Sequence, residues 1–263
     1  MANTTSDLSA LHVEEAGTGD PVVFLPGFSV GFAEYEPVRA RLADGYRVLS
    51  IDLPGSGRSG PQPRYFPATY YQDDAETIAT LIRSWASEPV HLVGHSDGGE
   101  VALLIAALHA DLARSVVVWG AAGHLNDSHR GIVEFFDAII DNPTSESAPY
   151  RAQLITAYGE EGARLTTKSF ARAIASIIAK GGDISLSKAY QIRCPTLLIT
   201  GEDDAFAPPA LVEAYAKRVP TAETEVAKGA GHDVHETHAG WFERRVFDWL
   251  KALEDTSGRR FLL

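Results

Sequence analysis

Residues 91–99 read HLVGHSDGG and carry the strongest structural signal in the chain. They place Ser96 in the pattern G-x-S-x-G, directly after an apolar run and before an alanine- and leucine-rich run at residues 101–108. In a sharp strand-to-helix turn the central residue is strained and side chains two positions away collide, which explains Gly94 and Gly98. The stretch therefore predicts an exposed serine hydroxyl at a helix N-terminus, where backbone N–H groups favour developing negative charge.

Short apolar runs rich in β-branched residues recur along the chain and end in turn residues. We expect buried strands in these runs, at residues 21–27, 46–55, 89–96, 114–123 and 195–204. Apolar residues at helical spacing lie between or after them, at residues 71–85, 101–108 and 241–250. Strands that alternate with helices predict a mostly parallel sheet with helices on both faces.

The alternation stops near Gly123 and resumes near Pro195, and the segment between them has helical patterns but no convincing buried strand. A loop-rich helical piece of this size would hardly hold its own core. We therefore expect an α/β core formed by residues 1–123 and 195–263, with residues 124–194 inserted after the sixth strand as a helical cap (lid). A separate second domain is the alternative.

Composition limits the classes of partner. The 263 residues carry a formal net charge of −12, with 45% hydrophobic and 22% charged residues, as in ordinary globular proteins. This charge disfavours nucleic acid and anionic membranes as partners, and no stretch approaches the roughly 18 apolar residues of a membrane span. We expect a small-molecule ligand and a monomer or homodimer.

Two further features bear on the compartment. Residues 1–17 lack the basic and apolar regions of a secretory signal. The single cysteine, Cys194, excludes an intrachain disulfide. A cytoplasmic setting is the expectation from these two observations.

A serine hydroxyl is a poor nucleophile unless a base removes its proton and a third group orients that base. On a strand-to-helix elbow the acid and then the histidine follow the serine in sequence. His232, in a glycine-rich loop before the last helical pattern, is the candidate base. Asp204 is the preferred acid, because its spacing from Gly201 and Pro208 is familiar in folds with this elbow; the neighbouring Asp203 is the alternative.

The oxyanion of a tetrahedral intermediate needs two N–H donors already aimed at it. The candidates are the backbone N–H of Asp97, directly after the serine, and that of Phe28, after Pro26-Gly27 in an early strand-ending turn. Four residues are expected to contact the substrate with their side chains: Phe28, His95, Asp97 and Trp119.

Three histidines, His232, His235 and His238, have the spacing H-x-x-H-x-x-H, which suggests a metal site at first sight. The glycine loop before His232 and the helix expected after His235 argue against a shared ligand geometry. We therefore expect neither a metal ion nor a cofactor.

The chain resembles the α/β-hydrolase fold family over nearly its whole length. The resemblance is carried by LPGF (25–28), DLPGSGRS (52–59), GHSDGG (94–99), GEDDAFAP (201–208) and GAGH (229–232), in the family's order. Within the family the chain is most similar to the valacyclovir hydrolase (biphenyl hydrolase-like) group, through LPGFSVG, GHSDGGEVALLIAA, VVVWGAAGHL and YGEEGAR. That group comprises serine esterases that cleave α-amino acid esters. The chain departs from it at His95, where a larger aromatic residue is usual, and in much of the cap.

The resemblance implies a cofactor-free serine carboxylesterase that forms an acyl-enzyme on Ser96. Asp97 has two interpretations: a carboxylate that stabilises the helix N-terminus, or a counter-ion for an ammonium group on the acyl part of the substrate. The alternatives with the same triad are a C–C bond, lactone or amide hydrolase and a perhydrolase. A ligand-binding sensor with little turnover is the alternative from another class.

Overall fold

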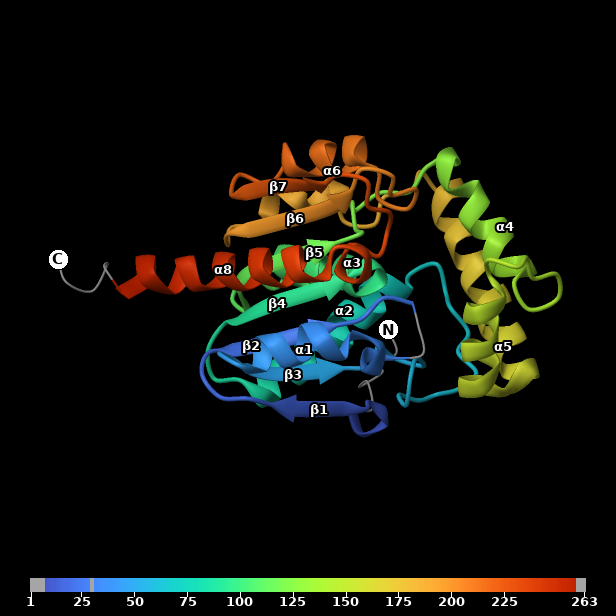
Figure 1. Cartoon of the computed structure of the whole chain (residues 1–263), viewed down its shortest axis with the longest axis horizontal. Helices are drawn as coiled ribbons and strands as arrows, with labels where there is room; N and C mark the ends of the chain where they lie inside the picture. The colour runs from blue at the N-terminus through green and yellow to red at the C-terminus, as the bar shows by residue number, and fades with distance from the viewer. Residues whose placement is uncertain (1–7, 29–30, 259–263) are drawn as a thin grey trace, which may run out of the picture.

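A computed structural model describes residues 8–28 and 31–258 of the chain. Its centre is a seven-stranded sheet with the order β1-β3-β2-β4-β5-β6-β7, in which only β1 runs antiparallel, to β3 (Figure 1). The strands are β1 Val13–Ala16, β2 Pro21–Leu25, β3 Arg47–Ile51, β4 Val90–His95, β5 Ala113–Trp119, β6 Thr196–Gly201 and β7 Ala222–Ala227. The expected mostly parallel α/β sheet is confirmed.

Helices cover both faces of the sheet (Figure 1). One face packs against α1 (Glu36–Ala43) and α8 (Ala239–Gly258). The other packs against α2 (Tyr70–Trp85), α3 (Ser96–Leu108) and α6 (Pro209–Ala216). Short turns of helix complete the connections: Leu8–Ala10, Phe32–Tyr35, Asp127–His129, Leu186–Gln191 and α7 (Val234–Thr237).

The central strands are buried on both sides, which explains their continuous apolar sequence. In β2, for example, Val23 and Leu25 face the core beneath α2 and α3, whereas Val22 and Phe24 face the core beneath α1 and α8. Successive side chains of a strand point to opposite faces, so both cores need apolar residues from the same strand.

The two edge strands were not predicted from the sequence. All four residues of β1 are exposed, and β7 has the sequence AETEVA with only Ala227 buried. Edge strands need no second buried face, so neither carries the apolar run by which the central strands were found. Arg245 on α8 pairs with Glu223 and Glu225 of β7, which places charges along this edge.

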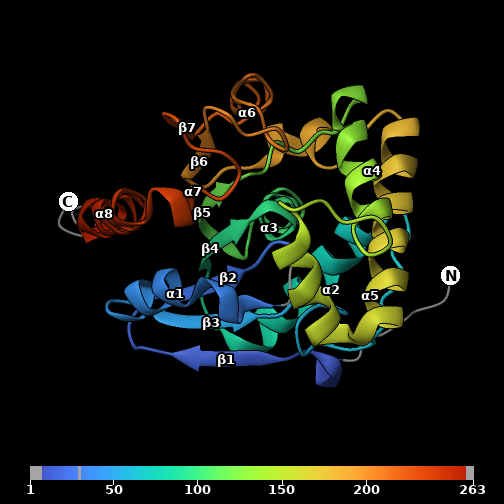
Figure 2. The ribbon, with the colours of Figure 1, turned by 45° about the vertical axis from the view of Figure 1, so that its right-hand side comes forward.

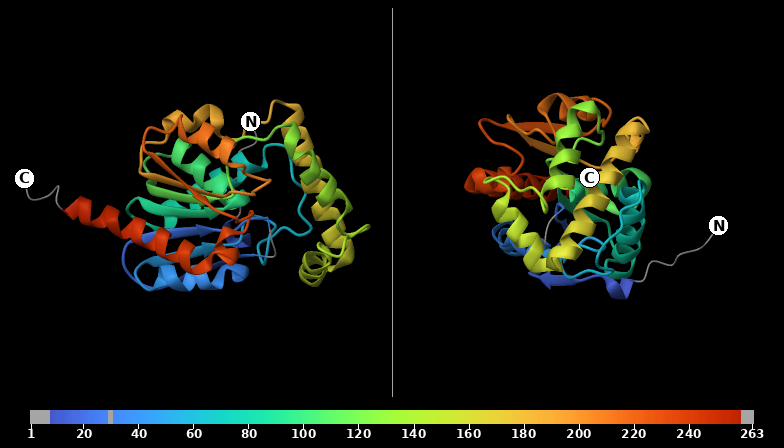
Figure 3. Two further views of the ribbon diagram at one scale, coloured as in Figure 1. Left: turned by 45° about the horizontal axis from the view of Figure 1, so that its top comes forward. Right: turned by 90° about the vertical axis from the view of Figure 1, so that its right-hand side faces the viewer.

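Two helices between β5 and β6 lie across the carboxyl ends of the strands: α4 (Arg130–Ala138) and α5 (Ala148–Ala179) (Figures 1 and 2). In Figure 3 they stand at the end of the molecule opposite to the C-terminal end of α8. Within the described residues the insertion follows the fifth strand, β5, and not the sixth as expected, since β1 is the one described strand that precedes β2.

Helix α5 bends sharply at Gly159, whose φ of 69° and ψ of 163° lie outside the helical region. A residue with a side chain rarely adopts such a positive φ, so glycine is suited to this position. Two tyrosines of α5 reach the core. The Tyr150 O–H donates to the Phe28 carbonyl at 2.7 Å, and the Tyr158 hydroxyl accepts from the Gly57 N–H at 2.9 Å.

Cys194 lies just before β6, where the chain returns from the inserted helices to the sheet. Its side chain is half-buried, and burial raises the pKa of the thiol to about 11.

No helix within residues 8–28 and 31–258 is long and apolar enough to cross a membrane.

Candidate active site

Ser96 begins α3 directly after the last residue of β4. It has a φ of 49° and is the one non-glycine residue with positive φ in the described part of the chain. A Cβ on Gly94 would lie 2.5 Å from the Gly98 carbonyl oxygen, and one on Gly98 would lie 2.3 Å from that of Leu25. The steric reason for both glycines is thus present in the structure, and the strain at Ser96 is the kind that turns store at functional sites.

The turn after β2 approaches this elbow closely. A Cβ on Gly27 would lie 3.1 Å from the Ser96 Cβ, so the Pro26-Gly27 segment sits against the serine. Phe28 follows and lines the same cavity, and its backbone N–H has no acceptor within the residues described. The N–H of Asp97 lies in the first turn of α3, where backbone donors lack intrahelical partners. Both expected oxyanion donors are therefore near Ser96. Residues 29 and 30 of the LPGFSVG motif lie outside the described residues.

Asp204 and His232 form a hydrogen-bonded pair. The Nδ1 of His232 lies 3.0 and 3.1 Å from the two carboxylate oxygens of Asp204. Asp204 Oδ1 also accepts the backbone N–H groups of Phe206 and Ala207, at 2.7 and 2.9 Å. Burial alone would raise the pKa of Asp204, but these hydrogen bonds and the nearby His232 lower it below its ordinary value. The alternative acid, Asp203, is exposed and makes no such contact with His232 in the described chain.

Ser96 and His232 line one cavity of about 500 Å³. No hydrogen bond joins the two side chains among the described residues, and in unliganded sites such bonds often tighten only when the substrate binds. The ring of Phe206 lies over His232, with 4.4 Å between the ring centroids. The cavity thus brings together a serine on an elbow, a histidine with one nitrogen held by a carboxylate, and two backbone donors.

An aromatic wall and a set of carboxylates line the cavity. Phe28, Phe136 and Phe170 contact one another, with ring centroids 4.1 to 5.0 Å apart, and bring the inserted helices against the turn after β2. The acidic side chains are Glu34, Asp97, Glu100, Glu146, Asp233 and Glu236. No lysine or arginine is among the lining residues in the described chain. The cavity is therefore apolar along one side and negatively charged.

Asp97 is buried, with 5% of its surface exposed. Its Oδ1 accepts the O–H of Tyr70 at 2.7 Å, and its side chain lines the cavity. Burial raises the pKa of this carboxyl, although hydrogen bonds from Tyr71 and Tyr70 and the positive charge of Arg64 lower it. Asp97 is thus positioned to meet a ligand as well as to stabilise the first turn of α3.

The expectation that Trp119 contacts the substrate is wrong. Trp119 is fully buried and does not line the cavity, because its side chain points to the sheet face covered by α8 and packs against Phe242 at 4.7 Å between ring centroids. His95 does line the cavity, stacked on Trp119 with 5.0 Å between the ring centroids. Trp119 therefore supports a lining residue from behind.

Tyr35 connects His95 to the turn after β2. Its hydroxyl accepts the Gly27 N–H at 3.1 Å and lies 2.8 Å from the His95 Nδ1. The direction of this bond depends on the tautomer of His95: when Tyr35 donates to Nδ1, the neutral His95 ring carries its proton on Nε2. Burial lowers the pKa of His95 well below its ordinary value, so this ring is neutral at physiological pH.

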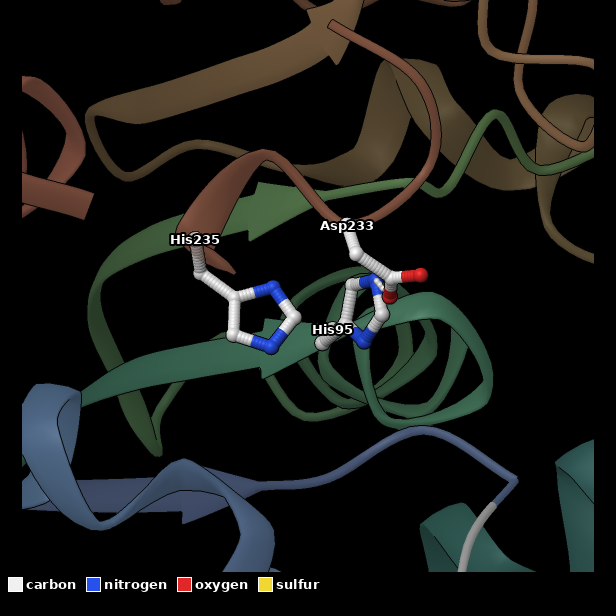
Figure 4. Close-up of side chains that lie close together, drawn as sticks. All are labelled: His95, Asp233 and His235. Carbon is white, nitrogen blue, oxygen red and sulfur yellow. Dashed lines mark ion pairs between the residues drawn. The ribbon is translucent and has the colours of Figure 1, made fainter. Parts of the chain in front are cut away.

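His232, His235 and His238, whose spacing suggested a metal site, do not form a common cluster. The cluster that does form is His95, Asp233 and His235, whose potential ligand atoms lie within 4.8 Å of one another (Figure 4). Trp119 Nε1–H donates to the His235 Nδ1 at 3.1 Å. The indole is a donor only, so Nδ1 supplies its lone pair to Trp119 and the neutral ring carries its proton on Nε2. Neither nitrogen of His235 is left with a free lone pair, and the cluster does not suit a metal ion.

The residues at the site that the sequence analysis missed include Tyr35, Tyr70 and Glu100. The tyrosines contribute through contacts between elements distant in sequence, which no local pattern indicates. Glu100 had a signal, since it is a carboxylate at the start of the apolar helical run 101–108. It is buried, it lines the cavity, and its Oε1 accepts the backbone N–H groups of Ala122 and Gly123.

Comparison with known proteins agrees with this geometry. The model of the alpha/beta hydrolase family matches residues 22–245, and the chain belongs to that family. It is an enzyme of the hydrolase class, with named hydrolases among its relatives.

The human protein named Serine hydrolase BPHL is 28% identical over 92% of this chain and 83% of its own length. The 2-(acetamidomethylene)succinate hydrolase of Mesorhizobium japonicum is 28% identical, with 86% of each chain covered. A 2-hydroxy-6-oxononadienedioate/2-hydroxy-6-oxononatrienedioate hydrolase from a Pseudomonas species is 25% identical over 92% of each chain.

Among solved structures, a serine hydrolase involved in carbazole degradation superimposes with a TM-score of 0.73 at 21% identity, covering 92% of this chain and 95% of that one. This likeness concerns the fold.

Proposed function

We propose that the protein is a cofactor-free serine carboxylesterase that cleaves small carboxylic esters through an acyl-enzyme on Ser96. The observation that carries the proposal is the pairing of His232 Nδ1 with a buried, ionised Asp204, in a cavity that also contains the elbow serine. A histidine held in this way presents Nε2 as the base.

In the proposed reaction Ser96 Oγ attacks the ester carbonyl while His232 Nε2 takes its proton. The carbonyl oxygen becomes negative and accepts hydrogen bonds from the backbone N–H groups of Phe28 and Asp97. His232 then protonates the departing alcohol. A water molecule, deprotonated by the same histidine, attacks the acyl-enzyme, which releases the carboxylic acid and restores Ser96.

We further propose that residues 124–194 act as a cap over this reaction, with residues 1–123 and 195–263 as the catalytic core. Support comes from the side chains that the inserted helices bring to the cavity, among them Phe136, Tyr150 and Phe170. An apolar wall of this kind gives the apolar part of the substrate a surface to pack against.

The charges of the cavity favour neutral or cationic substrates. Six carboxylates and no lysine or arginine among the described lining residues would repel a dianion. The dicarboxylates named for two of the relatives are therefore poor candidates for this chain. An α-amino acyl ester fits better, with Asp97 as the counter-ion of its ammonium group.

The nucleophile is tested with Ser96→Ala and a fluorophosphonate probe. The change deletes one hydroxyl, so the fold is expected to survive while ester hydrolysis falls by several orders of magnitude and labelling disappears. Mass spectrometry of the labelled unmodified protein should place the adduct on Ser96. Labelling that persists in the variant would refute the assignment.

Recognition of the acyl group is tested with an α-amino ester and its deaminated analogue. Asp97→Asn is nearly isosteric and keeps the backbone N–H, so kcat/KM is expected to fall about 10- to 100-fold for the amino ester, as for a lost charge-assisted hydrogen bond. The deaminated ester should change by less than about fivefold. Equal losses on both esters would assign Asp97 to the structure of the elbow alone.

A further inference from the structure

Glu100 is a buried carboxylate of the cavity that has no part in the proposed reaction. It lies on α3 three residues after Asp97, and 6% of its surface is exposed. Its Oε1 accepts the backbone N–H groups of Ala122 and Gly123 at 2.9 and 2.8 Å, which holds the loop after β5. Its Oε2 is buried and has no hydrogen-bond partner within the described residues. One carboxylate oxygen of Glu100 therefore stabilises the fold, and the other makes no described hydrogen bond.

A buried carboxylate oxygen without a donor is costly, and two events can relieve the cost. The group can take up a proton, or a donor can reach it from the cavity. Burial raises the pKa of Glu100 to about 7, and the negative charges of Asp97 and Asp183 add to this, although the N–H groups of Gly123 and Ala122 lower it. Since Oε1 already accepts two donors, the proton of the acid form belongs on Oε2. Near pH 7 the empty site thus contains both forms, and in the ionised form Oε2 lacks a donor.

Asp97 and Glu100 stand on one side of the same helix. Residues three apart in an α-helix have Cβ atoms about 5–6 Å apart, so their two carboxylates can contact one ligand group. Both side chains line the same cavity, in which no described lysine or arginine competes for them. Ionised carboxylates only accept hydrogen bonds, so a ligand without donors could satisfy neither of them. A cation with several N–H donors could satisfy both.

We propose that Glu100 is a second recognition carboxylate, and that its Oε2 and Asp97 together bind one cationic substrate group with at least two N–H donors, such as a primary ammonium. The proposal rests on the proposed function only in taking this cavity as the substrate site. The proposal predicts that cation binding is coupled to the release of a proton from Glu100. A cation favours the ionised form of Glu100, so binding lowers the pKa of that group and releases protons near neutral pH. Affinity for a cation that does not itself titrate should rise from pH 6 to pH 8.

The test uses ligand binding, so it does not depend on ester hydrolysis. The probe is 2-phenylethylamine, whose ammonium remains protonated because primary alkylamines titrate near about pH 10. The uncharged control is 2-phenylethanol. Isothermal titration calorimetry in two buffers of different ionisation enthalpy gives the affinity and the number of protons released.

Glu100→Gln is the informative variant, because its amide oxygen can keep both backbone hydrogen bonds while an NH₂ donor replaces Oε2. Affinity for the amine is expected to fall about tenfold and that for the alcohol by less than about twofold, as for a charge-assisted hydrogen bond. The release of protons seen with the unmodified protein should disappear. Unchanged amine affinity, or equal losses for both ligands, would overturn the proposal and leave Glu100 with a structural role.

Asp97→Asn is the matched variant. It should also weaken amine binding. Removing the negative charge of Asp97 lowers the pKa of Glu100, so proton release should persist but be smaller at pH 7 and reach its maximum at a lower pH. If Glu100→Gln does not fold, the number of protons released by the unmodified protein and by Asp97→Asn tests the role of Glu100. A lack of proton release in both proteins would refute that role. Fluorophosphonate labelling of Ser96 in the same samples reports separately on the proposed esterase activity.

Discussion

Asp204 illustrates how one carboxylate is committed to one task. It accepts two backbone N–H groups and the His232 ring, and its side chain is shielded from solvent. Asp203, its neighbour in sequence, is exposed. Adjacent residues of the same type therefore differ in burial and hydrogen bonding, and these differences assign the orienting role.

We expect Asp204→Asn to lower kcat by about 10⁴-fold, because an amide would hold His232 in the wrong tautomer. Asp203→Asn, the matched control, should leave kcat within about twofold, since it changes an exposed side chain. Initial rates on a p-nitrophenyl ester at pH 8 provide the measurement. A larger loss in Asp203→Asn than in Asp204→Asn would reverse the assignment.

At this scale the sequence predicts residues that belong to a local motif and misses those placed by tertiary contacts. Ser96, Asp204 and His232 follow from an elbow and two loops in a known order. The structure places Ser96 and His232 at one cavity and pairs Asp204 with His232. Trp119 is predicted to contact the substrate, but the pleat turns its side chain to the sheet face covered by α8. Its predecessor Val118 faces the other core, so strict alternation along β5 would have indicated this.

Within the inserted segment, α5 is the element connected most directly to the proposed chemistry. The hydrogen bond from the Tyr150 O–H to the Phe28 carbonyl links this helix to the peptide segment that contains the proposed oxyanion donor. Tyr158, eight residues further along, bonds to the Gly57 N–H in a different loop. The two tyrosines join the same helix to the core at points that differ in function.

Tyr150→Phe is expected to lower kcat by about three- to tenfold, because the Phe28 peptide loses the bond that fixes its orientation. Tyr158→Phe should lower the free energy of unfolding by about 1 kcal/mol, the contribution of one hydrogen bond, and leave kcat unchanged. Steady-state kinetics and thermal unfolding of both variants separate the two effects. A loss of kcat in both would mean that the inserted helices act through overall stability.

The elements found from the sequence are those with a buried apolar pattern. The central strands and α2 were expected within a few residues of their observed bounds. Helix α3 was placed at residues 101–108 but begins at Ser96, because Gly98 and Gly99 are weak helix formers that the elbow requires for close packing. The edge strands β1 and β7 lack an apolar face and are defined by their partners in the sheet.

For the whole molecule, the buried ionisable groups determine how stability depends on pH. His91 lies in the middle of the sheet, fully buried, with Nδ1 2.7 Å from the Ser115 hydroxyl of β5 and Nε2 without a partner in the described chain. Burial lowers the pKa of His91 to about 4. Between pH 6.5 and 4 the unfolded chain therefore takes up a proton that the folded chain refuses, and acidification favours unfolding.

His91 should thus account for about 3 kcal/mol of stability that is present above pH 6.5 and lost as the pH falls towards 4. We expect the free energy of unfolding of His91→Leu to change less steeply over this range than that of the unmodified protein, whatever the offset at pH 7. Urea titrations at half-unit pH intervals measure both slopes. Parallel slopes would show that His91 does not contribute.

Cys194 gives the chain an intrinsic chemical reporter. It is the only cysteine, it lies where the inserted segment rejoins the sheet, and burial keeps its thiol protonated at neutral pH. Thiol reagents attack the thiolate, so the folded protein should react slowly and mainly through transient openings of this junction. The rate of modification by an aromatic disulfide, with and without a ligand in the cavity, would therefore time those openings in a protein with no engineered label.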